Sequence, residues 1–138
     1  MKRVVKKVTI ASLLLVNAGV GAQGTSEPLS GLPLAPGMKR TADAIQTFRF
    51  CGKSASTVLY LAPFPDLDHE VAWYTHAMPG AAIFTASTGV KTFISKDGTA
   101  AVEASGAFIS YFRFSPGLSP AEMKILGAEP ASRDCTAD

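Results

Sequence analysis

Short apolar runs, each bounded by Gly, Pro or polar turn residues, recur along the chain after residue 44. They are rich in Val, Ile, Thr and Phe, which suit a pleated, half-buried surface. Several alternate apolar with polar residues, which is the period of a strand with one buried face. The pattern predicts six strands: Ile45–Cys51, Thr57–Ala62, Ala81–Ser87, Val90–Ser95, Ala100–Ser105 and Ala107–Phe114.

A helical pattern interrupts the strands at Pro65–Gly80 and is the strongest helix signal in the chain. Asp66 is placed to cap its start, because its carboxylate can accept from free backbone N–H groups there. Pro79 and Gly80 end it. Four apolar residues recur at spacings of four, three and four, which places them on one helix face: Leu67, Val71, Tyr74 and Met78.

A second, shorter helix is predicted near the end of the chain, at about 120–126. Ser119 and Glu122 have the spacing of a capping box, and Pro120 fits the first helical position. Gly127 is a typical stop.

The tight turns between strands, at Gly52-Lys53-Ser54 and at Lys96-Asp97-Gly98-Thr99, predict antiparallel pairing. We therefore expect an α+β fold. An antiparallel sheet of about five to six strands would carry the main helix (about 67–78) on one face, with the short C-terminal helix completing it. The strand Ala107–Phe114 has apolar residues on both faces, which predicts a central position in the sheet.

The first 22 residues have the pattern of a secretory signal peptide. Four basic residues precede the apolar stretch Val8–Val20, and Val20-Gly21-Ala22 fits a small-residue cleavage site. The apolar stretch is shorter than the roughly 20 residues that a membrane-spanning helix needs. The sequence thus predicts an exported protein, periplasmic or secreted, with no stable membrane anchor after signal cleavage.

Removing the signal peptide leaves two regions: a lead-in segment rich in Pro, Gly and Ser at 23–40, and a single α+β domain at 41–138. It also changes the charge. The chain has 13 Lys+Arg and 11 Asp+Glu, and four of the basic residues lie in the signal, which leaves nine against 11. A chain this close to neutrality has no electrostatic footprint for nucleic acid, so no nucleic-acid partner is expected.

Two cysteines, Cys51 and Cys135, are the whole cysteine content of the chain. An even number of cysteines in an exported protein predicts a disulfide bond. Two cysteines alone do not make a zinc site, which needs three or four protein ligands. No cofactor is expected.

The outer face of the main helix carries the candidate binding residues, His69, Trp73 and His76. They lie opposite or beside the apolar stripe, so they could contact a protein or a component of the cell envelope. The two histidines are seven residues apart, about 10 Å along the axis, which is too far to share one metal ion within the helix. For Trp73 taken alone, packing against the sheet edge or the lead-in segment is the favoured interpretation.

The leading functional hypothesis is a small exported, disulfide-tied bacterial domain that binds a partner without catalysis. A first alternative is a small hydrolase or metal-assisted enzyme that uses the acids and the histidine at the start of the main helix: Asp66, Asp68, His69 and Glu70. A second alternative is a carrier of a small apolar ligand, held between helix and sheet. The sequence identifies neither the partner nor the oligomeric state.

Overall fold

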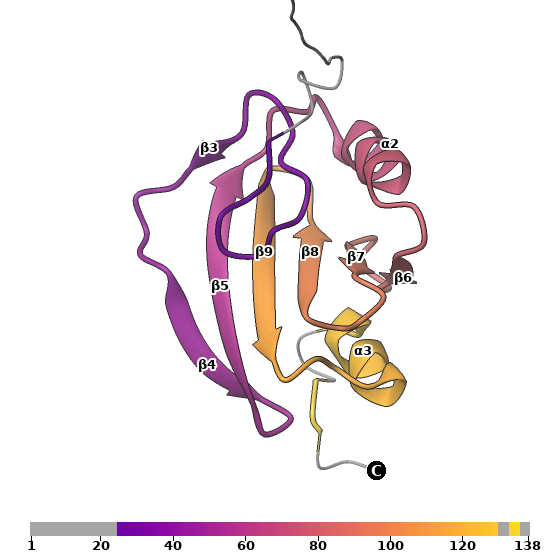
Figure 1. Cartoon of the computed structure of the whole chain (residues 1–138). Coiled ribbons are helices and arrows are strands. Elements are labelled where there is room, and N and C mark those ends of the chain that lie inside the picture. Colours follow the sequence, from indigo (N-terminus) through magenta and orange to yellow (C-terminus); the bar gives the residue numbers. More distant parts are fainter. Residues whose placement is uncertain (1–24, 130–132, 136–138) are drawn as a thin grey trace, which may run out of the picture.

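The computed structural model describes residues 25–129 and 133–135. The predicted signal peptide lies outside the described residues. Seven strands form one fully antiparallel sheet with two helices against it, which confirms the α+β prediction (Figure 1). The elements are β3 (Lys39–Arg40), β4 (Gln46–Phe50), β5 (Lys53–Leu61), α2 (Leu67–Ala77), β6 (Ala82–Thr85), β7 (Lys91–Ile94), β8 (Ala100–Ala104), β9 (Phe108–Ser115) and α3 (Pro120–Gly127).

The strands are arranged in the order β3-β5-β9-β8-β7-β6, and β4 also pairs with β5. Strands β3 and β4 share the outer edge of β5, because β3 pairs with its carboxyl end and β4 with its amino half. The last strand, β9, lies between β5 and β8, so its predicted central position is confirmed. The two-residue strand β3 is too short to leave a periodic signal in the sequence.

The pairing register separates two buried faces of the sheet. Val58, Tyr111, Val102 and Phe93 face one another across four strands and meet helix α2; we call this the α2 face. The neighbouring positions point to the opposite side, the α3 face, where Phe112, Ala101 and Ile94 pack with helix α3: its buried residues are Met123 and Leu126.

The hairpin between β4 and β5 is tighter than the sequence pattern indicated. Phe50 pairs with Lys53, so Cys51 and Gly52 alone make the turn. Both have positive φ, 50° and 76°, as a two-residue turn that matches strand twist requires. The predicted turn Gly52-Lys53-Ser54 is therefore shifted, and β5 begins at Lys53 rather than at Thr57. Polar, small residues at its start hide this extension, because they do not read as a strand.

Both helices begin as predicted. The Asp66 side chain accepts from the backbone N–H of His69, and Ser119 and Glu122 complete a reciprocal capping box. The four apolar residues of the α2 stripe all pack into the cluster on the α2 face. Helix α3 lies close to β6: a Cβ on Gly127 would lie 2.3 Å from the Cβ of Phe84, so no larger residue fits without movement.

Residues 25–38, which we call the strap, cross the α2 face over β5 and β9 (Figure 1). Leu32 and Ala35 of the strap are buried. The strap is also fixed by polar contacts, because the hydroxyl of Tyr111 donates to the carbonyl oxygen of Pro33 at 2.8 Å. Its Glu27 is 1% exposed and accepts from the hydroxyl of Tyr60 at 3.0 Å. The strap is thus part of the core of the domain.

The bond between Tyr60 and Glu27 gives the first testable prediction. Replacing Tyr60 with Phe removes one donor from a buried carboxyl group, which costs about 1–3 kcal/mol of unfolding free energy. Urea denaturation measures the loss. A double-mutant cycle with Glu27→Ala, which removes the acceptor oxygens, isolates the pair. A coupling energy below about 0.5 kcal/mol, the range of independent sites, would show that the strap is not held by this bond.

Candidate functional site

The three predicted binding residues on the outer face of α2 differ in their exposure to solvent. His69 and His76 are exposed, but Trp73 is only half-exposed. Its ring lies 6.1 Å from the ring of Phe64 and 4.9 Å from that of Tyr74, measured between centroids. Trp73 therefore packs against the α2 face along one edge, and the part that remains accessible is smaller than an exposed anchor would offer. A binding role for the three residues stays a prediction.

The acids and histidine at the start of α2 do not form one site. His69 Nδ1 lies 2.7 Å from Asp66 Oδ1, and this pair faces solvent. The backbone N–H and the imidazole of His69 lower the pKa of Asp66. Asp68 is exposed, whereas Glu70 is fully buried. The two catalytic carboxylates of a glycoside hydrolase must reach the same substrate. The side chains of Asp68 and Glu70 point to opposite sides of the helix, so they cannot do so.

Glu70 is the least expected feature of α2. It lies in the first turn, as predicted, but its side chain points inward and is 0% exposed. Oε1 accepts from the backbone N–H of Gly106 at 3.2 Å, and Oε2 has no hydrogen-bond partner among the described residues. Burial raises the pKa of Glu70 to about 7, although the Gly106 bond acts against the rise.

Three tyrosines and Glu27 form a second buried polar group on the α2 face. The Tyr74 and Tyr111 hydroxyls are hydrogen-bonded to each other. The Glu27 carboxyl accepts from the backbone N–H of Leu29, from the backbone N–H and the hydroxyl of Ser30, and from the Tyr60 hydroxyl. Burial and the bond to Glu27 raise the pKa of Tyr60 to about 12, and burial also raises the pKa of Tyr74 and Tyr111. These hydroxyls stay protonated and serve as structural donors.

Sequence reasoning missed both buried acids. A signal for Glu70 does exist, because it follows Leu67 by three residues and precedes Tyr74 by four, which puts it on the inner stripe. Glu27 has no comparable signal. Its partner Tyr60 lies 33 residues away, and only the fold brings the two together.

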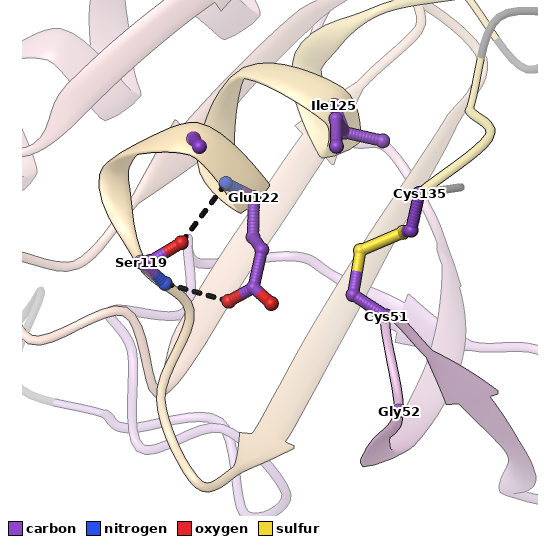
Figure 2. A pocket seen from close by; sticks show the side chains of 7 residues that line it. Cys51, Gly52, Ser119, Glu122, Ile125 and Cys135 are labelled. Carbon is purple, nitrogen blue, oxygen red and sulfur yellow. Dashed lines mark hydrogen bonds between the residues drawn. A yellow bond between two sulfur atoms is a disulfide. The ribbon is translucent and has the colours of Figure 1, made fainter. Parts of the chain in front are cut away.

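The disulfide between Cys51 and Cys135 is formed, as predicted, and joins residues 84 positions apart. It borders a surface hollow of about 540 Å³ beside α3 (Figure 2). The hollow is lined by Cys51, Gly52, Ser119, Ala121, Glu122, Ile125 and Cys135.

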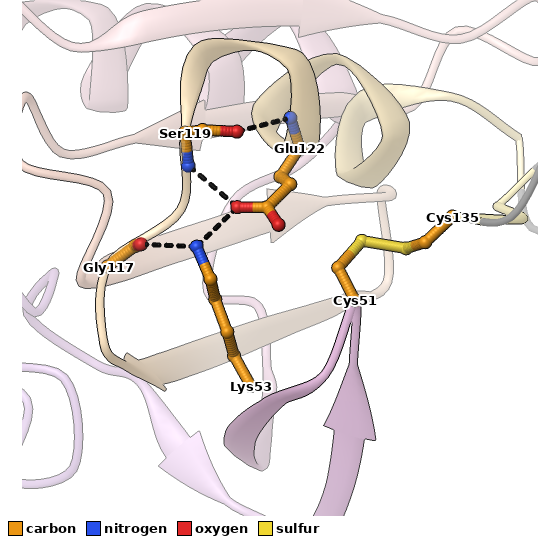
Figure 3. Close-up of a disulfide and its surroundings, with 6 residues drawn as sticks. All are labelled: Cys51, Lys53, Gly117, Ser119, Glu122 and Cys135. Carbon is orange, nitrogen blue, oxygen red and sulfur yellow. Dashed lines mark hydrogen bonds and ion pairs between the residues drawn. A yellow bond between two sulfur atoms is a disulfide. The ribbon is translucent and has the colours of Figure 1, made fainter. Parts of the chain in front are cut away.

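The polar groups beside this hollow are engaged with one another. Lys53 Nζ donates to the carbonyl oxygen of Gly117 at 2.8 Å and forms an ion pair with Glu122 (Figure 3). Glu122 Oε1 also accepts from the backbone N–H of Ser119 at 2.8 Å. The Lys53 contact and the Ser119 amide lower the pKa of Glu122. The arrangement ties the β4–β5 hairpin to α3, which is a structural role.

Part of the α3 face is left uncovered by α3. Leu61 pairs with Phe108 at the end of β5, and these side chains are 45% and 44% exposed. Phe48 on β4 is 37% exposed at the other end of the same face. A shallow depression of about 190 Å³ lies between the two ends, lined by Asp43, Ala44, Gln46, Thr57, Leu59 and Ser110. We call Phe48, Leu59, Leu61, Phe108 and Ser110 the open strip.

The described residues also bear on two alternatives, a metal site and a pocket for an apolar ligand. No three side chains among His, Cys, Asp and Glu gather there as metal ligands would. The space between α2 and the sheet is occupied by packed rings: Tyr74 and Phe93 lie 5.7 Å apart, and Tyr74 and Tyr111 lie 6.3 Å apart, between centroids. A mostly apolar groove does lie near α2, but at the carboxyl end of the helix, beside Met78, Pro79 and Lys96. No described helix is long and apolar enough to span a bilayer.

Comparisons of the chain with family models, curated proteins and solved structures give no match. The functional argument therefore rests on the residues and their geometry.

The disulfide gives a second prediction. A chain in which Cys51 and Cys135 are both replaced by Ala should lose about 4 kcal/mol of unfolding free energy, because the crosslink restricts the unfolded chain over a long loop. Urea denaturation with and without a reducing agent measures this. Reductant should destabilise the wild type and leave the double variant unchanged; equal stability of wild type in both conditions would contradict the prediction.

Proposed function

We propose that this protein is a small exported domain that binds an extended peptide segment of a partner protein on the open strip, without catalysis. The observation that carries the proposal is the exposure of Leu61, Phe108 and Phe48 on one sheet face. Several large apolar side chains exposed on one face, here an adjacent pair and a third further along the strip, are typical of interaction sites, whereas single exposed ones are not.

The shape of the strip favours a peptide as the occupant. Its apolar ends, Phe48 opposite Ala55 and Phe108 opposite Leu61, are separated by six residues of β5, or about 20 Å. The depression between them is lined by the polar side chains of Gln46 and Ser110, and by Thr57, whose hydroxyl donates to the carbonyl oxygen of Tyr111 at 2.9 Å. A small ligand cannot reach both ends.

The size of the strip also argues against a permanent dimer. A stable protein–protein interface involves about 20–30 residues on each side, and the open strip has five. An extended segment with apolar side chains spaced to meet both ends, and polar groups between them, matches its pattern.

Export is supported by two independent features. The signal-peptide pattern at Met1–Ala22 predicts translocation. The disulfide between Cys51 and Cys135 requires an oxidising compartment to persist, as in a periplasm or outside the cell. The partner is therefore sought among proteins of the cell envelope or the exterior.

The outer face of α2 is the rival contact surface, with the exposed His69 and His76 beside the half-buried Trp73. It offers two titratable rings and only part of one indole. The open strip offers three large apolar side chains, so we place the contact there.

Site-specific photocrosslinking tests the proposal. A benzoylphenylalanine residue replaces Phe108 in the exported chain, and a matched control carries it at Ile83, which is 45% exposed on β6 and faces the α2 side. In producing cells, the Phe108 position should give a discrete adduct with one other protein, which mass spectrometry identifies, and the Ile83 position should give none.

Affinity measurements with the identified partner then separate the two surfaces. Calorimetry should show binding weakened tenfold or more by Leu61→Ser, but less than about twofold by Ile83→Ser, since a buried apolar contact is worth about 1.5–3 kcal/mol. Weakening by His76→Ala alone would move the contact to α2 and overturn the proposal. An adduct of twice the chain mass would also overturn it, because the occupant would be a second copy.

A further inference from the structure

The side chain of Glu70 bridges two elements that are far apart in sequence. It leaves the first turn of α2, enters the α2 face and accepts from the backbone N–H of Gly106 in the β8–β9 turn. Gly106 has φ 105°, a conformation that residues with a Cβ rarely adopt. A glycine at this position permits the turn conformation in which the N–H reaches Glu70.

Among the described residues, no cation forms an ion pair with the Glu70 carboxyl. The ion pairs found among the described residues all lie elsewhere: Lys53–Glu122, Asp66–His69 and Glu103–Arg133. On α2, Asp66, Asp68 and His69 are exposed, and Tyr74 is the buried titratable neighbour.

The turn that Glu70 contacts brings no positive charge. The β8–β9 turn, residues 105–107, contains Ser, Gly and Ala. On β8, Glu103 lies on the α3 face opposite Ser110. On the strap and β5, Glu27 and Tyr60 are bonded to each other. The cation beside this pair is Arg40 of β3, which pairs with Tyr60 and acts on its hydroxyl. An ionised Glu70 would be a buried negative charge with one backbone N–H as its hydrogen-bond donor among the described residues, which is strongly unfavourable.

The β8–β9 turn also supports one end of the open strip. Gly106 precedes Phe108 by two residues, and the carbonyl oxygen of Ala107 accepts from the backbone N–H of Ala62, next to Leu61, at 3.0 Å. A movement of this turn would displace both apolar side chains at that end.

We propose that Glu70 is a proton-operated latch between α2 and the β8–β9 turn. The protonated carboxyl stays buried and holds the Gly106 amide. When the proton leaves, the carboxylate moves to water, and the contact between the helix and the turn opens. The opened turn no longer positions Phe108 and Leu61, so the accessible form of the open strip depends on pH.

Thermodynamic linkage gives the direction in which pH changes the stability of the latch. The pKa of Glu70 is raised from 4.5 to about 7 in the closed form, so the closed form holds the proton more tightly than an open form in water. The latch is fully stable below about pH 4.5 and weakens as pH rises through 7. Between pH 5 and 8.5, the opening equilibrium constant should rise by a factor approaching roughly 100, since each pKa unit is tenfold.

Amide hydrogen exchange of the purified chain, followed by NMR, tests the latch without any partner. After correction for the intrinsic effect of pH on exchange, protection of the Gly106 amide should fall from pH 5 to 8.5. The Leu118 amide, which donates to Gly98 at the opposite end of the sheet, serves as the reference for global unfolding and should keep its protection.

Two variants make the experiment specific. Glu70→Gln keeps an oxygen for the Gly106 N–H and carries no charge, so its Gly106 protection should not depend on pH. Asp68→Asn removes an exposed carboxylate from the same helix turn and should behave as the wild type. Equal pH dependence in Glu70→Gln and wild type would overturn the latch, as would constant Gly106 protection in the wild type.

A carboxyl ¹³C titration of the wild type gives a second readout that needs no variant. The Glu70 signal should titrate near pH 7, and a midpoint near 4.5 would overturn the latch. Since neither measurement uses the partner, a failed latch leaves the peptide-binding proposal standing. A failed crosslink at Phe108 likewise leaves the latch standing.

Discussion

The ladder between β5 and β9 pairs eight residues of each strand, from Ser54 with Ser115 to Leu61 with Phe108. These strands come from opposite halves of the chain, and almost everything else is placed by their pairing. The ladder fixes which residues face α2 and which face α3. Because neighbouring side chains of a strand point to opposite sides, a slip of one residue would exchange the two faces. It would move the tyrosine cluster out of contact with the strap.

The two faces that this ladder separates differ in the polarity of their buried side chains. On the α3 face, Phe112, Phe114 and the residues of α3 form an apolar contact. On the α2 face, buried rings carry hydroxyl groups, and two acids lie among them. Each buried hydroxyl therefore needs a partner at a fixed place, which makes this side more specific in geometry and more sensitive to substitution. The strap supplies several of those partners, and so acts as part of the core.

Much of this fold could be predicted from the sequence, because its elements have strong local signals. The α2 stripe, both helix caps and the two faces of β9 follow from spacing alone, and the disulfide follows from an even cysteine count. The amino half of β5 and the two-residue β3 could not be predicted, since their residues are small, polar or few. The site was harder still. The exposure of Leu61 and Phe108 depends on how far α3 extends over the sheet, which no local pattern states.

The position of the strap sets an order on how the chain becomes native. Its residues are among the earliest of the described chain, yet the hydroxyl that binds Pro33 belongs to Tyr111, 78 residues later. If a chain emerged from an export channel with its amino end leading, the strap would emerge long before β9, the strand on which it packs. Until β9 has emerged and paired, Glu27 and the apolar residues of the strap have no site to occupy. The first described segment of the chain is thus among the last to reach its final contacts.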